Sequence, residues 1–166
     1  MVRTRYIIIG ALVVTIGIAA SVSFFESEEK KVKKQFSSLA QWASKERGEN
    51  TFTMALKIQN LGSLFAERST LRSHINSISG SYTRQEITSL AGRGRLQFFE
   101  LSVRFHDHQI EFSEKDLARV RVTGQLSGTL KGEDIVDDTL ELEVGLKKFQ
   151  DKWLFTAFEV VEVLEK

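Results

Sequence analysis

Two histidines, His106 and His108, are the first candidates for chemistry in this sequence, and they flank Asp107. On a regular strand, residues i and i+2 share a face, so the two imidazoles would lie together with the carboxylate opposite. Such a pair can bind a metal, but a metal site needs a third ligand, and His74 lies far away in the chain. We therefore expect no metal here, and the pattern favours a ligand contact or a solvent-exposed polar bend.

The apolar positions change from odd to even numbers on passing these histidines. They are Leu101, Val103, Phe105, Ile110 and Phe112. An extra residue in a strand shifts the parity in this way, so we predict a β-bulge within 106–109. Because bulges re-aim side chains, His106 and His108 are candidate ligand-binding residues.

Glu159 is the second candidate. If Gln150 and Asp151 form a two-residue turn, strand pairing places Glu159 opposite Leu142, on an apolar face. Desolvation there would raise the pKa of the carboxyl group and make it a candidate general base, whereas a register slip of one residue would turn it to the other face. Tyr82, just before a helix cap, completes the candidate ligand-binding set. We assign no catalytic residue and no cofactor, and an enzyme of isomerase or dehydratase type using a buried carboxylate or His is the alternative interpretation.

Composition narrows the function classes. The 166 residues include no cysteine, which excludes disulfides, a thiol nucleophile and a cysteine zinc site. Removing Arg3 and Arg5 from the 23 basic residues leaves 21 against 22 acidic ones. Nucleic-acid-binding modules usually carry a basic excess, so we expect no nucleic-acid partner.

The N-terminal region predicts a membrane anchor. Residues 1–5 form a short basic tail, and Tyr6 to Phe25 is an uncharged, mostly apolar run. As a helix, such a run spans about 30 Å, the thickness of the hydrocarbon core. We favour an uncleaved signal anchor over a cleaved signal peptide, for which small residues near Ala19 offer processing sites, and over a buried core helix. The positive charges at Arg3 and Arg5 favour a single-pass protein of the cell inner membrane with its domain in the periplasm, although four lysines follow the run within residues 30–34.

The rest of the chain predicts an α+β domain of three helices on a curved antiparallel sheet of four to five strands. Apolar spacing predicts a juxtamembrane helix over residues 26–47, a second helix from Asn50 or Thr51 that Gly62 ends, and a third that begins at a Thr83/Glu86 capping box. We expect a short strand over 63–68 and a polar connection over 69–81. Four strands with alternating patterns follow over residues 101–112, 117–130, 138–149 and 152–164.

The last strand is apolar at both odd and even positions. Because a strand that is apolar on both faces is covered on both, we predict an interface on the outer sheet surface. Its candidate residues are Phe158, Val160 and Leu164. The expected partner is a second copy of the chain or another protein.

The order of elements over about residues 28–165 resembles the nuclear transport factor 2-like (SnoaL-like, cystatin-like) cone fold. The resemblance rests on the SISGSYTRQEI entry into the third helix, on the strand pattern and on the closing hairpin KKFQDKWLFTAFEV. That hairpin often reads Asp-Gly-Lys-Trp in the superfamily, and here Asp151 precedes Lys152 without the glycine. The resemblance implies a cone whose mouth is the ligand site, in a superfamily of isomerases, dehydratases and non-enzymatic binding or assembly domains, some anchored in membranes as parts of secretion machinery. We therefore expect a membrane-anchored extracytoplasmic interaction or ligand-binding module, with a small apolar molecule as a further candidate partner.

Overall fold

The computed structural model of this chain describes residues 27–73 and 79–164. The chain divides into two compact units, Met1–Val32 and Lys33–Lys166. In the first, the described part is the start of a helix that covers residues 27–43, where Lys31 Nζ lies 2.8 Å from Glu28 Oε1. The predicted membrane segment lies outside the described residues. Within the described ranges, no helix has the length and apolar content needed to cross a membrane.

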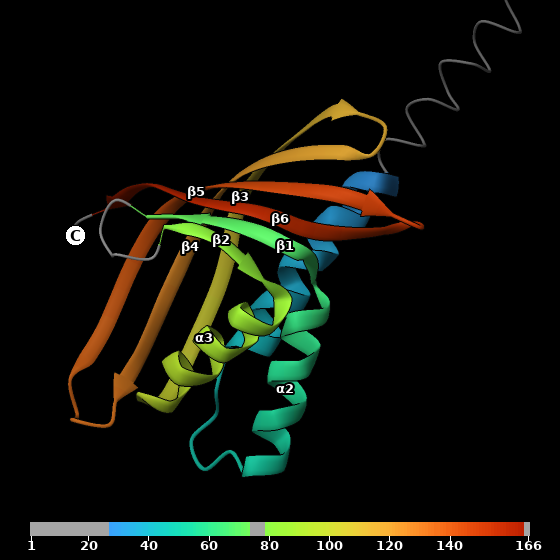
Figure 1. Cartoon of the computed structure of the whole chain (residues 1–166). Helices are drawn as coiled ribbons and strands as arrows, with labels where there is room; N and C mark the ends of the chain where they lie inside the picture. Colours follow the sequence, from blue (N-terminus) through green and yellow to red (C-terminus); the bar gives the residue numbers. More distant parts are fainter. Residues whose placement is uncertain (1–26, 74–78, 165–166) are drawn as a thin grey trace, which may run out of the picture. The chain divides into compact units, whose positions relative to one another are not determined.

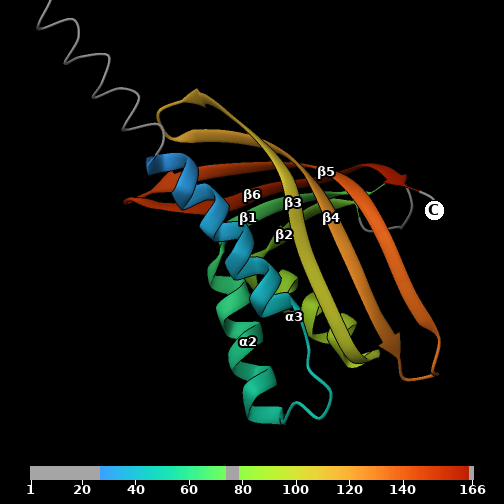
Figure 2. The ribbon, with the colours of Figure 1, turned by 180° about the vertical axis from the view of Figure 1, so that it is seen from behind.

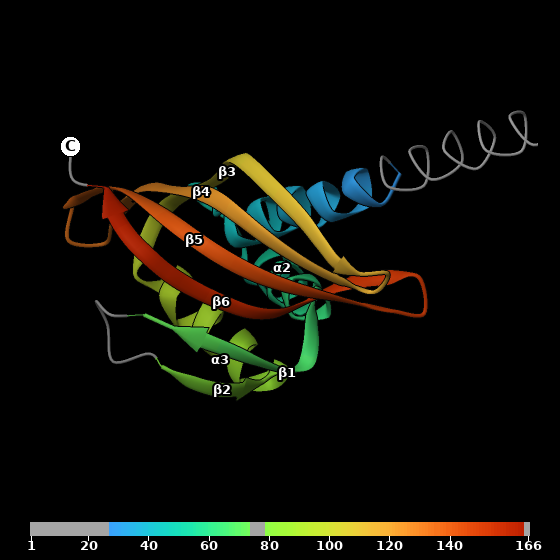
Figure 3. The ribbon, with the colours of Figure 1, turned by 90° about the horizontal axis from the view of Figure 1, so that it is seen from above.

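The second unit is built on a six-stranded mixed sheet, in the order β2-β1-β6-β5-β4-β3 (Figure 3). The strands are β1 (Phe65–Arg72), β2 (Gly80–Thr83), β3 (Phe98–Glu114), β4 (Leu117–Leu130), β5 (Ile135–Phe149) and β6 (Lys152–Leu164). Neighbours pair antiparallel except β1 and β6, which run parallel. The four predicted C-terminal strands are confirmed, and β3 and β5 extend beyond their predicted ends.

The prediction for residues 69–81 was wrong. The chain there continues β1 as far as Arg72 and then forms β2, which pairs Tyr82 with Ser69 and Gly80 with Leu71. β2 is an edge strand and β1 lies next to it, and both carry exposed polar residues, so they lack the alternation that marks a half-buried strand. The sheet consequently has more strands than expected and is not wholly antiparallel.

Helix α2 (Thr51–Ser63) and helix α3 (Arg84–Leu96) begin where the sequence predicts. The Asn50 side chain accepts a hydrogen bond from the backbone N–H of Thr53 at 2.8 Å, and Thr83 forms the predicted capping box with Glu86. Both helices lie on the same side of the sheet, as Figures 1 and 2 show from opposite directions.

The first helix is shorter than predicted because its last residues take another role. It ends at residue 43, and Lys45 then pairs with Leu101 on the edge of β3. The two backbone hydrogen bonds of this pair measure 2.7 and 2.9 Å, and the Ser44 hydroxyl accepts a third from the Val103 N–H at 2.9 Å. Residues 44–46 thus cover part of an open sheet edge, which would otherwise expose unpaired backbone groups.

Aromatic rings fill the space between the helices and the sheet. The Phe36 ring lies edge-on to Phe105 and to Phe155, with centroids 5.4 and 5.2 Å apart. Phe65 and Phe158 continue the cluster on the far side of Phe155. Phe36 and Phe155 are almost wholly buried, and each such ring contributes a large buried apolar area, so this cluster is the centre of the core.

The two-sided apolar pattern of β6 has a different cause from the one predicted. A register shift in the β5–β6 pairing between Leu146 and Gly145 changes the parity, so that Phe155 lies opposite Leu146, Phe158 opposite Val144 and Val160 opposite Leu142. Directly opposite residues share a face, so Phe158 and Val160 lie on the helix side of the sheet and not on the outer side. Leu164, opposite Thr139, remains 39% exposed. The apolar residues that motivated an outer interface therefore mostly serve the core.

Candidate functional site

The predicted bulge in β3 is confirmed. His106 lies opposite Thr123 and Gln109 opposite Arg121, so Asp107 and His108 together face a single residue of β4. Asp107 adopts a left-handed backbone conformation with φ 54°. The prediction that the two histidines share a face was wrong, because the extra residue turns His108 to the helix side and leaves His106 on the outer side.

The two histidines consequently have different environments. The His106 side chain is 48% exposed, and its Nδ1 lies 3.7 Å from a carboxylate oxygen of Asp107. The His108 ring packs edge-on against Phe36 with centroids 5.0 Å apart, and its Nε2 is buried without a hydrogen bond to the described protein. Burial, followed by the positive charges of Lys33 and His106, lowers the pKa of His108 below its ordinary value, against a smaller opposite effect of Asp107. His108 is therefore a neutral imidazole at neutral pH.

His108 lines a hollow of about 390 Å³ between the first helix and the edge of β3, here called the imidazole hollow. Its apolar walls are Phe36, Ala40, Val103 and Phe105. Its polar groups are Ser37, Arg104 and His108, so it contains no carboxylate. Within residues 27–73 and 79–164, no cluster of histidine and acidic side chains has the arrangement of a metal site.

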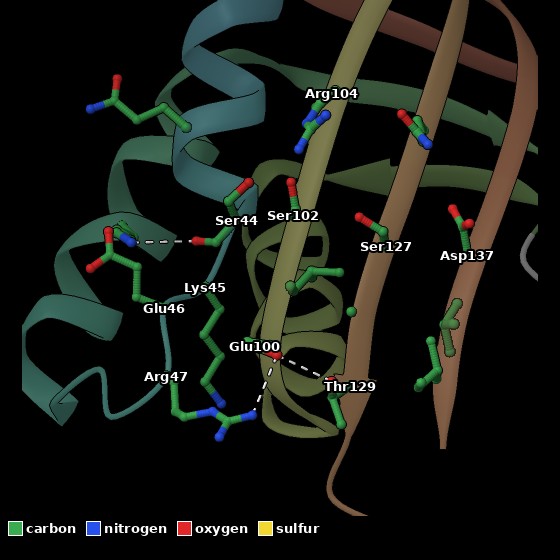
Figure 4. A pocket seen from close by; sticks show the side chains of 17 residues that line it. Ser44, Lys45, Glu46, Arg47, Glu100, Ser102, Arg104, Ser127, Thr129 and Asp137 are labelled. Carbon is green, nitrogen blue, oxygen red and sulfur yellow. Dashed lines mark hydrogen bonds and ion pairs between the residues drawn. The ribbon is translucent and has the colours of Figure 1, made fainter. Parts of the chain in front are cut away.

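A larger polar groove of about 940 Å³ lies on the other side of Arg104, around the segment 44–47 (Figure 4). A row of short polar side chains crosses three strands here, because Ser102 lies opposite Ser127 and Ser127 opposite Asp137. Glu100 lies at one end of the groove, where its carboxylate accepts a hydrogen bond from Thr129 at 3.2 Å and lies 3.4 Å from Arg47. The groove therefore presents hydroxyls and both signs of charge to a polar ligand or protein segment.

A buried ionic cluster supports the wall of this groove. The guanidinium of Arg95 donates to the carbonyls of Trp42, Ala43 and Ser44 at 2.6–2.7 Å, which are the free acceptors at the end of the first helix. It also pairs with Glu49, whose other oxygen lies 2.7 Å from Lys57 Nζ.

Lys57 and Arg95 stabilise the ionised form of Glu49. Burial alone would raise its pKa, but hydrogen bonds from Lys57 and Arg95 outweigh burial and place the pKa below the ordinary value. On helix α3, Gly94 is exposed, whereas its neighbour Arg95 is buried. The helical spacing from Ile87 was a signal that could have identified Arg95, because residues i and i+8 lie on nearly the same side of a helix.

The structure does not bring the four candidate ligand residues together. Glu159 lies opposite Glu143, not Leu142, because the register shifts after the confirmed two-residue turn at Gln150 and Asp151. Its side chain is 40% exposed and lies 3.8 Å from Arg72, so the buried position predicted for it was wrong. Tyr82 lines a separate hollow of about 460 Å³ on β2, and β2 and β3 form opposite edges of the sheet.

Comparison with known proteins identifies the fold and no more. No protein-family model matches the chain, and no curated protein matches it in sequence. Among solved structures, LinA superposes with a TM-score of 0.70 at 12% identity, covering 87% of this chain and 91% of that one. A type 2 hexachlorocyclohexane dehydrochlorinase (LinA) gives 0.67 at 10% identity, with 85% and 90% covered.

A protein of unknown function from Nostoc punctiforme, described as having a cystatin-like fold, is also similar. Its TM-score is 0.61 at 12% identity, with 83% of this chain and 92% of that chain covered. Sequence identities this low are informative about architecture, since one fold supports many functions. The chain therefore has the cystatin-like, nuclear transport factor 2-like α+β fold that its sequence resembles.

Proposed function

We propose that this protein is a membrane-anchored, extracytoplasmic binding module whose main contact surface is the polar groove around Ser102 and Ser127. The proposal rests on what fills the space between the helices and the sheet. The rings of Phe36, Phe105 and Phe155 fill the space between helices and sheet, where a reaction chamber would lie. The buried charged groups bond to one another, so their chemistry serves the fold.

The groove supports recognition of a polar partner. Ser102, Ser127 and Asp137 form one row of short polar side chains along the floor of the groove, here called the shelf. Segment 44–47, which is hydrogen-bonded to β3, forms the wall beside it. A rigid wall and a shelf of short side chains allow another backbone or polar molecule to approach closely and exchange hydrogen bonds. Arg47, whose side chain is 71% exposed, adds a charge at the rim.

Co-purification of the full-length protein from detergent-solubilised membranes tests this function. Ser102→Trp would fill the shelf with a large ring and should remove a specific partner that the unchanged protein retains. Glu114→Trp places the same ring at the exposed far end of β3 and should leave the partner bound. Recovery of the protein alone, or equal recovery of the partner with both variants, would contradict the proposal.

One observation favours a second candidate function, an enzyme that removes a proton. His108 is a neutral imidazole beside apolar walls, and general bases of this kind need a pKa near or below the working pH. The type 2 hexachlorocyclohexane dehydrochlorinase, which shares the fold, bears an enzyme name, although its identity to this chain is too low to transfer an activity. An elimination activity lost in His108→Gln and kept in His106→Gln would support this candidate over the binding module.

A further inference from the structure

Arg104 is placed to bind something outside the protein. It borders both the imidazole hollow and the polar groove, and its side chain is exposed (Figure 4). Within residues 27–73 and 79–164, its guanidinium has neither an ion pair nor a hydrogen bond, whereas Arg47, Arg95 and Arg119 each lie beside a carboxylate. A guanidinium carries five N–H donors in a planar fork that matches a carboxylate in two-point geometry.

The imidazole hollow beside Arg104 has the charge that an anion requires. None of its lining residues is acidic, and the positive charge of Lys33 acts on the His108 ring more strongly than the negative charge of Asp107. Within it, the buried Nε2 of His108 lacks a hydrogen-bond partner, and a buried polar group without a partner destabilises the folded protein. A ligand oxygen beside this ring would supply the missing partner.

The remaining walls are suited to an apolar body. Phe36, Phe105, Val103 and Ala40 surround a volume of about 390 Å³, which lies within the range of small-molecule sites, about 300–1,000 Å³. Ser37 adds one hydroxyl, which now donates weakly to the carbonyl of Lys33 at 3.3 Å. The site therefore offers one cationic end and a small apolar pocket.

We propose that the imidazole hollow binds a small amphipathic carboxylate, such as an arylalkanoate, with the carboxylate on Arg104 and the ring against Phe36 and Phe105. This inference deepens the ligand-binding part of the proposed function and names its ligand class. Inorganic anions would use Arg104 but gain nothing from the apolar walls. Neutral aromatic molecules would use the walls but not the guanidinium.

Fluorine NMR of 4-fluorophenylacetate with the full-length protein in lipid nanodiscs tests the site, with 4-fluorophenylacetamide as the matched neutral probe and empty nanodiscs as the blank. We expect the carboxylate to bind at least tenfold more tightly than the amide. Arg104→Gln should abolish that difference, and Arg119→Gln, which removes an exposed arginine elsewhere on the sheet, should preserve it. Phe36 is a core residue, so Ala40→Phe is the better variant for filling the hollow, and it should weaken both probes.

Several results would overturn the site. Equal binding of acid and amide, unchanged carboxylate binding in Arg104→Gln, or no binding of either probe at millimolar concentration would each reject it. Displacement of the probe by sulfate at an equal concentration would reduce the site to a general anion contact. Co-purification of a partner, and its loss in Ser102→Trp, are measured independently of ligand binding in the imidazole hollow. A negative result for the hollow therefore leaves the test of the proposed function unaffected.

Discussion

At the level of single residues, a buried arginine connects segments that lie about 50 residues apart in the chain. Arg95 joins the end of the first helix to the segment before α2, and Glu49 is its buried counter-ion. Removing one partner of a buried pair leaves an uncompensated charge, which typically costs about 3–5 kcal/mol. The cluster is therefore a structural joint between elements rather than a catalytic pair.

Replacement of the carboxylate tests this role. Glu49→Gln should lower the free energy of unfolding by about 3–5 kcal/mol in urea denaturation, because Arg95 and Lys57 would remain buried without a counter-charge. Glu100→Gln removes an exposed partner of Arg47 and should cost less than about 1 kcal/mol. Similar losses in both variants would contradict the joint.

The same carboxylate predicts an acid-sensitive component of stability. The folded-state pKa of Glu49 is lower than in the unfolded chain, so its contribution is complete above the unfolded value of 4.5 and is lost as pH falls through the folded value. Urea denaturation between pH 7 and pH 3 should show this loss in the unchanged protein. In Glu49→Gln the slope in this range should be smaller.

His108 predicts a second pH dependence, at higher pH. Its folded pKa is lowered, so the unfolded chain binds the proton more readily, and stability should fall as pH drops below about 6.5. His108→Leu should remove this component, whereas His106→Gln should keep it because that side chain is exposed. Parallel profiles for the unchanged protein and His108→Leu would show that the imidazole is not desolvated by folding.

How far the sequence predicts the site depends on the kind of signal. The bulge around His106 was predictable because an extra residue changes the parity of the apolar positions. The side to which each histidine turns was not, since it depends on which residue of the bulge is left-handed, here Asp107. Arg104 has no local signal, because its lack of a partner depends on the packing of the first helix against β3.

At the level of elements, close contact between α2 and α3 explains two glycines and leaves a third without a packing reason. A Cβ on Gly62 would lie 2.3 Å from the Thr88 methyl group, and one on Gly92 would lie 3.2 Å from Ile58. A Cβ on Gly94 would meet nothing within 4 Å. The close packing at Gly62 and Gly92 is therefore between the two helices.

These glycines give a matched test. Gly94→Ala should stabilise the protein by about 0.5–1 kcal/mol, because alanine reduces the freedom of the unfolded chain and no atom obstructs it. Gly62→Ala should destabilise it by about 1–3 kcal/mol, because the helices must move apart or Thr88 must change rotamer. Thermal denaturation of both variants measures the effects, and the same sign for both would contradict the packing.

Strand β6 shows why periodicity alone placed Phe158 and Val160 on the wrong face of the sheet. Its apolar residues occupy both parities, which on a regular strand would place them on two faces. A register shift against β5, between Leu146 and Gly145, places Phe158 and Val160 on the helix side. The two-residue turn at 150–151 was predictable from the hairpin pattern, but a bulge inside an all-apolar stretch leaves no parity signal of its own.

At the level of the whole molecule, the predicted α+β class is confirmed, the sheet is mixed and not wholly antiparallel, and the anchor stays a prediction. The three helices and the four long strands followed from capping residues and alternation, which are local signals. The parallel pairing of β1 with β6 joins residues far apart in the sequence, so local patterns could not reveal it. The groove depends on the same kind of distant pairing, between Lys45 and Leu101.

The absence of cysteine makes the membrane orientation directly measurable. Single cysteines can be introduced at Ile135, which is 82% exposed, and at Thr4 in the basic tail, and each can be treated in intact cells with a membrane-impermeant maleimide. If residues 6–25 anchor an exported domain, Ile135→Cys should react in intact cells and Thr4→Cys only after permeabilisation. The charge at Arg3 and Arg5 is kept in both variants, so the orientation signal is unchanged. The reverse pattern would place the domain in the cytoplasm, and loss of the Thr4→Cys label together with release of the protein from washed membranes would show that the segment is cleaved.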